Sequence, residues 1–166
     1  MDLKGKKVLV FGAGKSGIGA ADLLGSVGAQ PIIYDGNENL DKEAVLHKTN
    51  GTYTPEIWAG AFPEGEMESL DLVVMSPGVP TDLPVVLAMK EKGIPVWGEI
   101  ELAYVCGKGD VLGITGTNGK TTTTSLLGEI MKNARDSVFV VGNIGTPYTN
   151  AAADTREDSV IVAEMS

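Results

Sequence analysis

The sequence predicts an α/β fold made of two successive parallel-sheet units. Short apolar runs alternate with helix-like segments along the 166 residues, and this alternation is typical of parallel sheets covered on both faces. Two glycine-rich loops, at residues 12–17 and 116–119, each stand between an apolar run and a helix-like segment. Because the two loops and their flanking segments are about 100 residues apart and are not repeats of each other, we expect two domains.

Composition excludes several classes of protein. Apolar residues make up 43% and charged residues 21%, so enough apolar material is present to form a core. The net charge of −9 makes nucleic acid a poor partner. A single cysteine, Cys106, excludes an internal disulfide framework. No apolar run has the length of a signal-peptide core or of a membrane helix, so we expect a cytoplasmic protein with no membrane insertion.

The first unit is expected to span residues 1–98. Compact apolar runs ending at glycine, proline or aspartate predict its strands, and apolar residues at helical spacing predict its helices. We expect strands at 7–11, 31–34, 70–75 and 94–97, and helices at 16–27, 41–48 and 83–92. Residues 50–69 are ambiguous, with a short strand near Ile57 as one interpretation.

A connector is expected at residues 99–110, carrying one helical turn. Glu99 and Glu101 are spaced i,i+2, which does not place both on one helical face, so we expect both to be solvated. The second unit, 111–166, predicts strands at 111–115, 138–141 and 159–165.

A helix is predicted from residue 120 to about 134, with the apolar i,i+4 pairs Leu126/Ile130 and Leu127/Met131 on it. Three strands and one helix are too few to cover a parallel sheet, so we expect a domain that is cut short, with exposed apolar strand surface that favours association.

The first glycine loop fits the pattern G-x-G-x-x-G, with glycines at Gly12, Gly14 and Gly17. In a Rossmann-like domain these glycines permit the tight turn, the approach of a diphosphate and close helix packing. The helix that follows offers free N–H groups to phosphates. Asp35, at the end of the next strand, is placed to hold a ribose hydroxyl. The alternative is a glycine turn used only for packing, and NAD is the usual ligand of such a loop.

The second glycine loop is close to a P-loop, G-x-x-x-x-G-K-[ST], and predicts an ATP-binding domain. Ile114 stands where the strict pattern has glycine, but Gly119, Lys120 and Thr121 are retained and open a helix. Lys120 is expected to neutralise the β- and γ-phosphates, and Thr121 to bind Mg²⁺. The residues expected at the phosphates of ATP are Gly116, Thr117, Asn118, Gly119, Lys120, Thr121 and Thr122.

Glu164 ends the last predicted strand. Acids at strand ends are common, but one beside a phosphate loop is placed to bind its magnesium ion. We therefore predict Thr121 and Glu164 as metal ligands, and Lys120 and Glu164 as catalytic residues.

The motif Thr115-Gly-Thr-Asn-Gly-Lys-Thr121 resembles the ATP loop of the Mur ligases and the folylpolyglutamate synthetases. The rest of the chain resembles the N-terminal part of a Mur ligase in the same order and over nearly its full length. The segments that carry this resemblance are 12–17, 76–79, 98–102, 115–121, 142–147 and 163–166.

The resemblance implies that the first domain binds the UDP end of a substrate and not NAD. The residues implied for the UDP-sugar are Gly14, Lys15, Ser16, Asp35, Gly78, Asn143 and Ser166. Relatives carry a basic residue at the position after Asp35-Gly36, and Asn37 stands there in this chain, which puts one charged contact in doubt.

The activity implied is that of an ADP-forming amide ligase of peptidoglycan precursor synthesis, with ATP and Mg²⁺ as cofactors. Within the family, the pattern fits best the member that adds D-glutamate to UDP-N-acetylmuramoyl-L-alanine through an acyl phosphate. These two small molecules are the expected substrates. A second metal site and the domain that binds the amino acid are not in this sequence, so we expect the chain to be inactive alone.

Three alternatives remain at this point. An NAD-linked oxidoreductase or sensor domain accounts for the first loop but leaves Gly119, Lys120 and Thr121 without a role. A non-catalytic nucleotide-binding module needs a complete second sheet. Another Mur ligase, of different amino-acid specificity, also fits.

Overall fold

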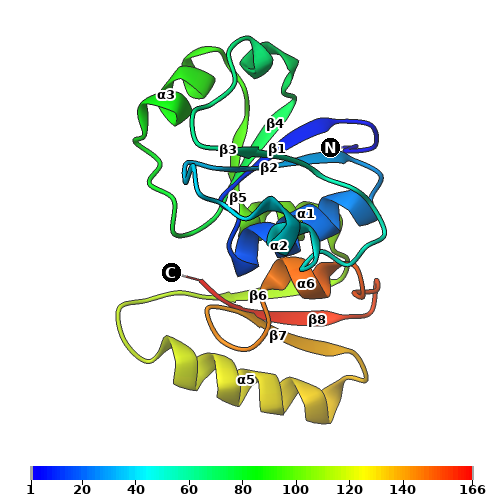
Figure 1. Ribbon diagram of the computed structural model, residues 1–166. Helices are drawn as coiled ribbons and strands as arrows, with labels where there is room; N and C mark the ends of the chain where they lie inside the picture. Colours follow the sequence, from blue (N-terminus) through cyan, green and yellow to red (C-terminus); the bar gives the residue numbers. More distant parts are fainter. Residues whose placement is uncertain (1, 166) are drawn as a thin grey trace. The chain divides into compact units, whose positions relative to one another are not determined.

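A computed structural model describes residues 2–165 and confirms the α/β class with parallel sheets (Figure 1). The contacts between residues divide the chain into two compact units, 1–102 and 103–166. Each unit contains one sheet. Within the described residues, no helix is long and apolar enough to cross a membrane.

The first unit contains a five-stranded parallel sheet in the order β3-β2-β1-β4-β5. The chain moves outward from β1 to β3 and then crosses to the other side of β1 for β4 and β5. Ligands of such sheets bind where this direction reverses, beyond the carboxyl ends of the strands. The strands are β1 (Lys7–Phe11), β2 (Gln30–Asp35), β3 (Glu56–Ala59), β4 (Leu72–Met75) and β5 (Val96–Gly98).

Helices cover both faces of this sheet, which explains why β4 and all of β1 after Lys7 are apolar. Right-handed connections place α1 and α2 on one face and α3 on the other, since the chain moves in opposite directions along the sheet. Val86 and Met89 of α3 pack into a cluster with Leu9 and Val73. The helical segments are α1 (Lys15–Ser26), α2 (Lys42–Leu46), the 3-10 turn η1 (Glu66–Ser69), α3 (Pro84–Glu91) and α4 (Glu99–Cys106).

The second unit contains a three-stranded parallel sheet in the order β6-β8-β7. The central strand β8 is buried along its length, whereas β6 and β7 are partly exposed. Helices α5 and α6 lie on opposite faces of this sheet (Figure 1). The elements are β6 (Asp110–Ile114), α5 (Lys120–Ala134), β7 (Val138–Gly142), α6 (Tyr148–Ala152) and β8 (Val160–Glu164).

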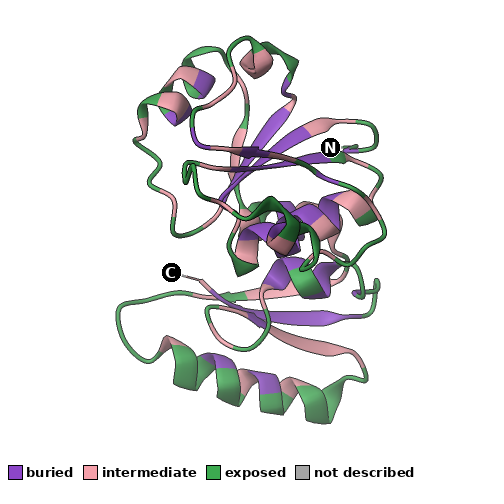
Figure 2. Ribbon diagram, in the orientation of Figure 1, coloured by how far each residue is buried: buried purple, intermediate pink, exposed green. Residues whose placement is uncertain are grey.

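Helix α5 packs on the sheet through small residues. Thr124 and Gly128 are buried, and a Cβ at Gly128 would lie 2.5 Å from a methyl group of Val140. The apolar pair Leu126 and Ile130 instead faces outward, 62% and 53% exposed. Figure 2 shows this exposed face along α5. The second unit therefore presents apolar side chains on a helix as well as partly open edge strands.

Three segments differ from the sequence-based expectation. The ambiguous residues 50–69 contain the strand β3 and the turn η1. The connector contains the eight-residue helix α4 where one helical turn was expected. Helix α6 was not predicted, because five residues are too few to show an apolar period.

The core of the first unit gives a test of this packing. Leu9 is fully buried in β1, so Leu9→Ala is expected to lower the free energy of unfolding by about 2–5 kcal/mol. Leu87→Ala, on the exposed side of α3, is the matched control and should change it by less than about 0.5 kcal/mol. Urea unfolding followed by tryptophan fluorescence reports this unit alone, because Trp58 and Trp97 both lie in it. Equal effects of the two variants would contradict the packing.

Candidate functional site

Strand register brings residues from distant parts of the sequence to one edge of the first sheet. Phe11 pairs with Tyr34 and with Met75, and Met75 pairs with Gly98. The next residues along these four strands therefore form a row at the carboxyl edge. That row is Asp35, Gly12, Ser76 and Glu99.

In this row, the glycine loop after β1 lies very close to the first turn of α1 and to Ser76. Gly12 has a φ of +111°, a conformation that side chains disfavour. A Cβ at Gly17 would collide with the carbonyl oxygen of Gly12 and would lie 3.0 Å from Ser76 Oγ. The first turn of α1 therefore lies directly on the end of β1. Gly14 is the N-cap of α1, so the first backbone N–H groups of this helix are free to bind an anion.

Asp35 holds this loop in place. Its Oδ2 accepts a hydrogen bond from the backbone N–H of Ala13 at 3.0 Å, and its Oδ1 accepts one from Asn37 at 3.0 Å. The carboxylate thus ties the end of β2 to the loop after β1. A carboxylate oxygen has a second lone pair, so Asp35 can still accept a hydrogen bond from a ligand.

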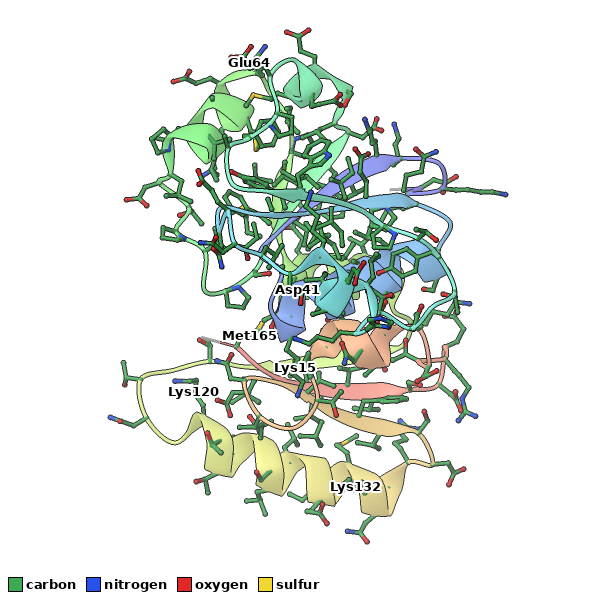
Figure 3. All side chains as sticks on the ribbon, viewed as in Figure 1. Lys15, Asp41, Glu64, Lys120, Lys132 and Met165 are labelled. Atoms are coloured by element: carbon green, nitrogen blue, oxygen red, sulfur yellow. The ribbon has the colours of Figure 1, made fainter. Side chains whose placement is uncertain are left out.

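Gly78 lies in an exposed turn at the end of β4. The turn is anchored by Ser76, whose N–H donates to the carbonyl oxygen of Phe11 at 3.0 Å, and it is closed by a bond from Val79 N–H to the Ser76 carbonyl oxygen at 3.0 Å. Lys15 and Ser16 open α1 at the same edge, and Figure 3 labels Lys15. The structure therefore brings Gly14, Lys15, Ser16, Asp35 and Gly78, five of the residues that the resemblance implies for the UDP-sugar, to one edge of the first sheet.

The burial of Glu99 differs from the sequence-based expectation. Glu99 was expected to be solvated, but it is only partly exposed, and its Oε2 is buried without a hydrogen-bond partner among the described residues. Burial raises the pKa of its carboxyl group above the ordinary value, and the neighbouring Ser16 hydroxyl lowers the pKa by a smaller amount. Glu101, two residues further on, is exposed as expected.

The second glycine loop follows β6 in the other unit. Gly116 has a φ of +142°, and Gly119, the N-cap of α5, has a φ of +76°. Lys120 opens α5 and donates from Nζ to the carbonyl oxygen of Gly116 at 2.6 Å (Figure 3). The lysine thus bridges the two ends of the loop. The remaining residues of the predicted phosphate site, Thr117, Asn118, Thr121 and Thr122, are exposed beside it.

Glu164 ends the central strand β8, between the ends of β6 and β7. It is only 4% exposed, and its Oε2 is buried with no hydrogen-bond partner in the part of the chain that is described. A buried carboxylate oxygen without a hydrogen-bond partner is unfavourable, and a bound cation would supply the missing partner. No cluster of three or more histidine, cysteine or acidic side chains exists within residues 2–165. The donor set therefore fits Mg²⁺ held by one carboxylate, a hydroxyl and phosphate oxygens, because magnesium uses few protein ligands.

Asn143 lies directly beyond β7 in the same unit. Its N–H donates to the carbonyl oxygen of Glu164 at 3.2 Å, and Met165 N–H donates to the carbonyl oxygen of Ile114 at 2.8 Å. The three strand ends are thus joined by backbone hydrogen bonds. Asn143 is exposed, and it belongs to the unit of Lys120 and Glu164. Ser166 lies outside the described residues.

Sequence reasoning did not place two residues at the carboxyl edge of the first sheet. Ser76 and Glu99 both follow a strand directly, in the same row as Gly12 and Asp35. Aligning the predicted strand ends would have indicated them, since parallel strands end at one edge.

Comparisons with known proteins match the two parts of the chain to two family models. Residues 6–98 match the family described as "Mur ligase MurD-like, N-terminal domain", and residues 114–166 match "Mur ligase middle domain". The chain is 57% identical over its full length to a UDP-N-acetylmuramoylalanine–D-glutamate ligase from Lachnospira eligens and 55% identical to one from Lachnoclostridium phytofermentans. It spans 37% of the length of each of these relatives.

Solved structures support the fold. A murein peptide ligase from Psychrobacter arcticus matches 98% of this chain and 38% of its own with a TM-score of 0.57, at 19% identity. A ligase from Neisseria meningitides, named as acting on UDP-N-acetylmuramate, matches 96% of this chain and 52% of its own with a TM-score of 0.54, at 20% identity.

A substitution at Gly17 tests the close contact between the first turn of α1 and the end of β1. Gly17→Ala is expected to lower the free energy of unfolding of the first unit by more than about 1 kcal/mol, because the added methyl group meets backbone atoms that cannot move aside. Gly36→Ala is the control, since a Cβ there meets nothing within 4 Å. Tryptophan fluorescence in urea measures both. A Gly17 variant as stable as the Gly36 variant would contradict the geometry.

Proposed function

The chain belongs to the Mur ligase family, and from this premise we propose that it supplies the nucleotide-binding part of an ADP-forming ligase. The ligase adds D-glutamate to UDP-N-acetylmuramoyl-L-alanine, the activity in the names of its relatives. The observation that carries the proposal is the presence of two phosphate-type glycine loops, one in each unit, each at the carboxyl edge of a parallel sheet.

In this proposal the first unit binds the UDP end of the substrate. The free N–H groups at the start of α1 bind the diphosphate, with Lys15 supplying positive charge beside them. Asp35 and Gly78 flank the loop at the ends of β2 and β4, where they contact the nucleoside. For Asn143 and Ser166, an assignment to the UDP-sugar stays a prediction of the sequence resemblance.

The second unit binds ATP. The backbone of residues 116–119 surrounds the phosphates, and Lys120 exchanges its bond to the Gly116 carbonyl oxygen for the phosphate oxygens. Thr121 and Glu164 would hold Mg²⁺, which would supply positive charge to stabilise the negative charge on the phosphates. The unpartnered Oε2 of Glu164 supports this assignment among the described residues.

The reaction joins a carboxylate and an amine. The carboxylate of the L-alanyl group attacks the γ-phosphorus of ATP, so that an acyl phosphate forms and ADP leaves. The amine of D-glutamate then attacks the acyl carbon, and inorganic phosphate leaves. Lys120 contributes by stabilising charge on the γ-phosphate, and Glu164 by fixing the ion beside it.

A dinucleotide-binding oxidoreductase is the competing interpretation of the first loop. It assigns no role to Lys120, which opens α5, or to Glu164, which ends β8. The ligase assigns a role to both loops, and we favour it for that reason.

ATP binding by the second unit tests the proposal. The chain is expected to bind ATP in the presence of Mg²⁺, and Lys120→Ala should weaken this binding at least about tenfold, because a charge-assisted phosphate contact is lost. Glu164→Gln should weaken binding with Mg²⁺ but leave binding in EDTA unchanged. Isothermal titration calorimetry measures the affinity for ATP of the unchanged chain and of both variants.

Lys132→Ala is the matched control, because Lys132 lies near the far end of α5 and pairs with Glu129 (Figure 3). It should bind ATP as the unchanged chain does. Equal affinities of the Lys120 and Lys132 variants would contradict the proposal for the second unit.

A further inference from the structure

Two buried oxygens beside the first glycine loop lack partners. Ser76 Oγ and Glu99 Oε2 are both inaccessible to solvent, and neither has a hydrogen bond to another described residue. Buried polar groups are nearly always hydrogen-bonded, so two such atoms at one edge need an explanation. The roles proposed above leave both unused.

The two residues occupy neighbouring positions in the row at the carboxyl edge. Met75 and Gly98 are paired, so Ser76 and Glu99 follow on adjacent strands, about 4.8 Å apart in backbone spacing. Both side chains approach the start of α1. A Cβ at Gly17 would lie 3.0 Å from Ser76 Oγ, and the Ser16 hydroxyl lies against the Glu99 carboxyl.

This is the place where the proposed function puts the diphosphate, and phosphate oxygens only accept hydrogen bonds. The Ser76 hydroxyl can donate to them. An ionised Glu99 carboxylate cannot donate and would repel a dianion, whereas a protonated carboxyl group donates one hydrogen bond. The raised pKa of the Glu99 carboxyl, caused chiefly by burial, favours the protonated form.

The other charged groups on the neighbouring elements do not cancel the rise in the pKa of Glu99. Lys15 and Asp22 lie on α1, Asp35 ends β2, and Glu101 lies on α4. None of them contributes to the shift in the pKa of Glu99, for which burial and Ser16 account. Ser76 is uncharged, and β4 carries no ionisable side chain.

We propose that Glu99 binds the diphosphate of the nucleotide substrate in its protonated form, donating a hydrogen bond to a phosphate oxygen beside Ser76. Where Glu99 is ionised in the free protein, it takes up one proton from solvent as the ligand binds. Glu99 thereby couples the affinity of the substrate site to pH. This inference rests on the proposed function of the first unit.

Calorimetry with UDP-N-acetylmuramoyl-L-alanine tests the inference. The diphosphate of this ligand is a diester with no proton to gain near neutral pH, so any proton taken up belongs to the protein. Titrations in two buffers of different ionisation enthalpy give the number of protons bound. We expect uptake of up to about one proton, and an affinity that falls by up to about tenfold per pH unit between the pKa of Glu99 in the free protein and its higher pKa in the complex.

Glu99→Gln is expected to bind without this proton uptake and with an affinity that does not change between about pH 6 and about pH 8, because the amide donates at every pH. Glu101→Gln is the matched control on the same helix and should retain both the uptake and the pH dependence. Tryptophan fluorescence in urea checks that both variants are folded.

Binding by the unchanged chain with no proton uptake at any pH between about 6 and about 8 would overturn the inference and leave the proposed function intact. Proton uptake that persists in Glu99→Gln would also overturn it. No binding of the ligand at any pH would overturn the proposed function, and this inference with it.

Discussion

The first unit depends on one close approach, where the first turn of α1 lies on the end of β1. At Gly17 there is no room for even one carbon atom, because the carbonyl oxygen of Gly12 occupies that space. The approach directs the free N–H groups of α1 along the carboxyl edge of the sheet. Asp35 then fixes the loop by accepting the N–H of Ala13. A larger residue at Gly17 would move the helix away and separate the groups that form the site.

The same rule of construction operates in both units. Parallel strands end at one edge, so residues that follow different strands become neighbours without any contact in sequence. In the second unit this rule places Glu164 and Asn143 beside the ends of their neighbouring strands, with backbone bonds between them. Each edge also leaves a carboxyl oxygen buried and unpartnered among the described residues, on Glu99 and on Glu164. A buried polar atom without a hydrogen-bond partner lowers the stability of the folded protein, and a bound partner would remove that cost.

Sequence reasoning found the elements with strong local signals. The strand β1 and the helix α5 have the predicted bounds, and β4 begins two residues later than predicted but ends where expected, because apolar runs and glycine loops mark these elements. It missed α6, which is too short for a periodic pattern although Pro147 stands at its start. The pair Leu126 and Ile130 has helical spacing, yet small residues on another side of α5 make the contact with the sheet.

The candidate site was predicted only where a motif marks it. Glu99 was expected to be solvated because its spacing from Glu101 argued against a shared helical face. Its environment is instead set by the pairing of β5 with β4, a tertiary contact that local spacing does not encode.

The most direct measurement is a calorimetric titration of the chain with UDP-N-acetylmuramoyl-L-alanine, with NAD as the competitor. The account predicts that the UDP ligand binds and that NAD neither binds nor displaces it. Binding of NAD alone would contradict the account and would make the first loop a dinucleotide site.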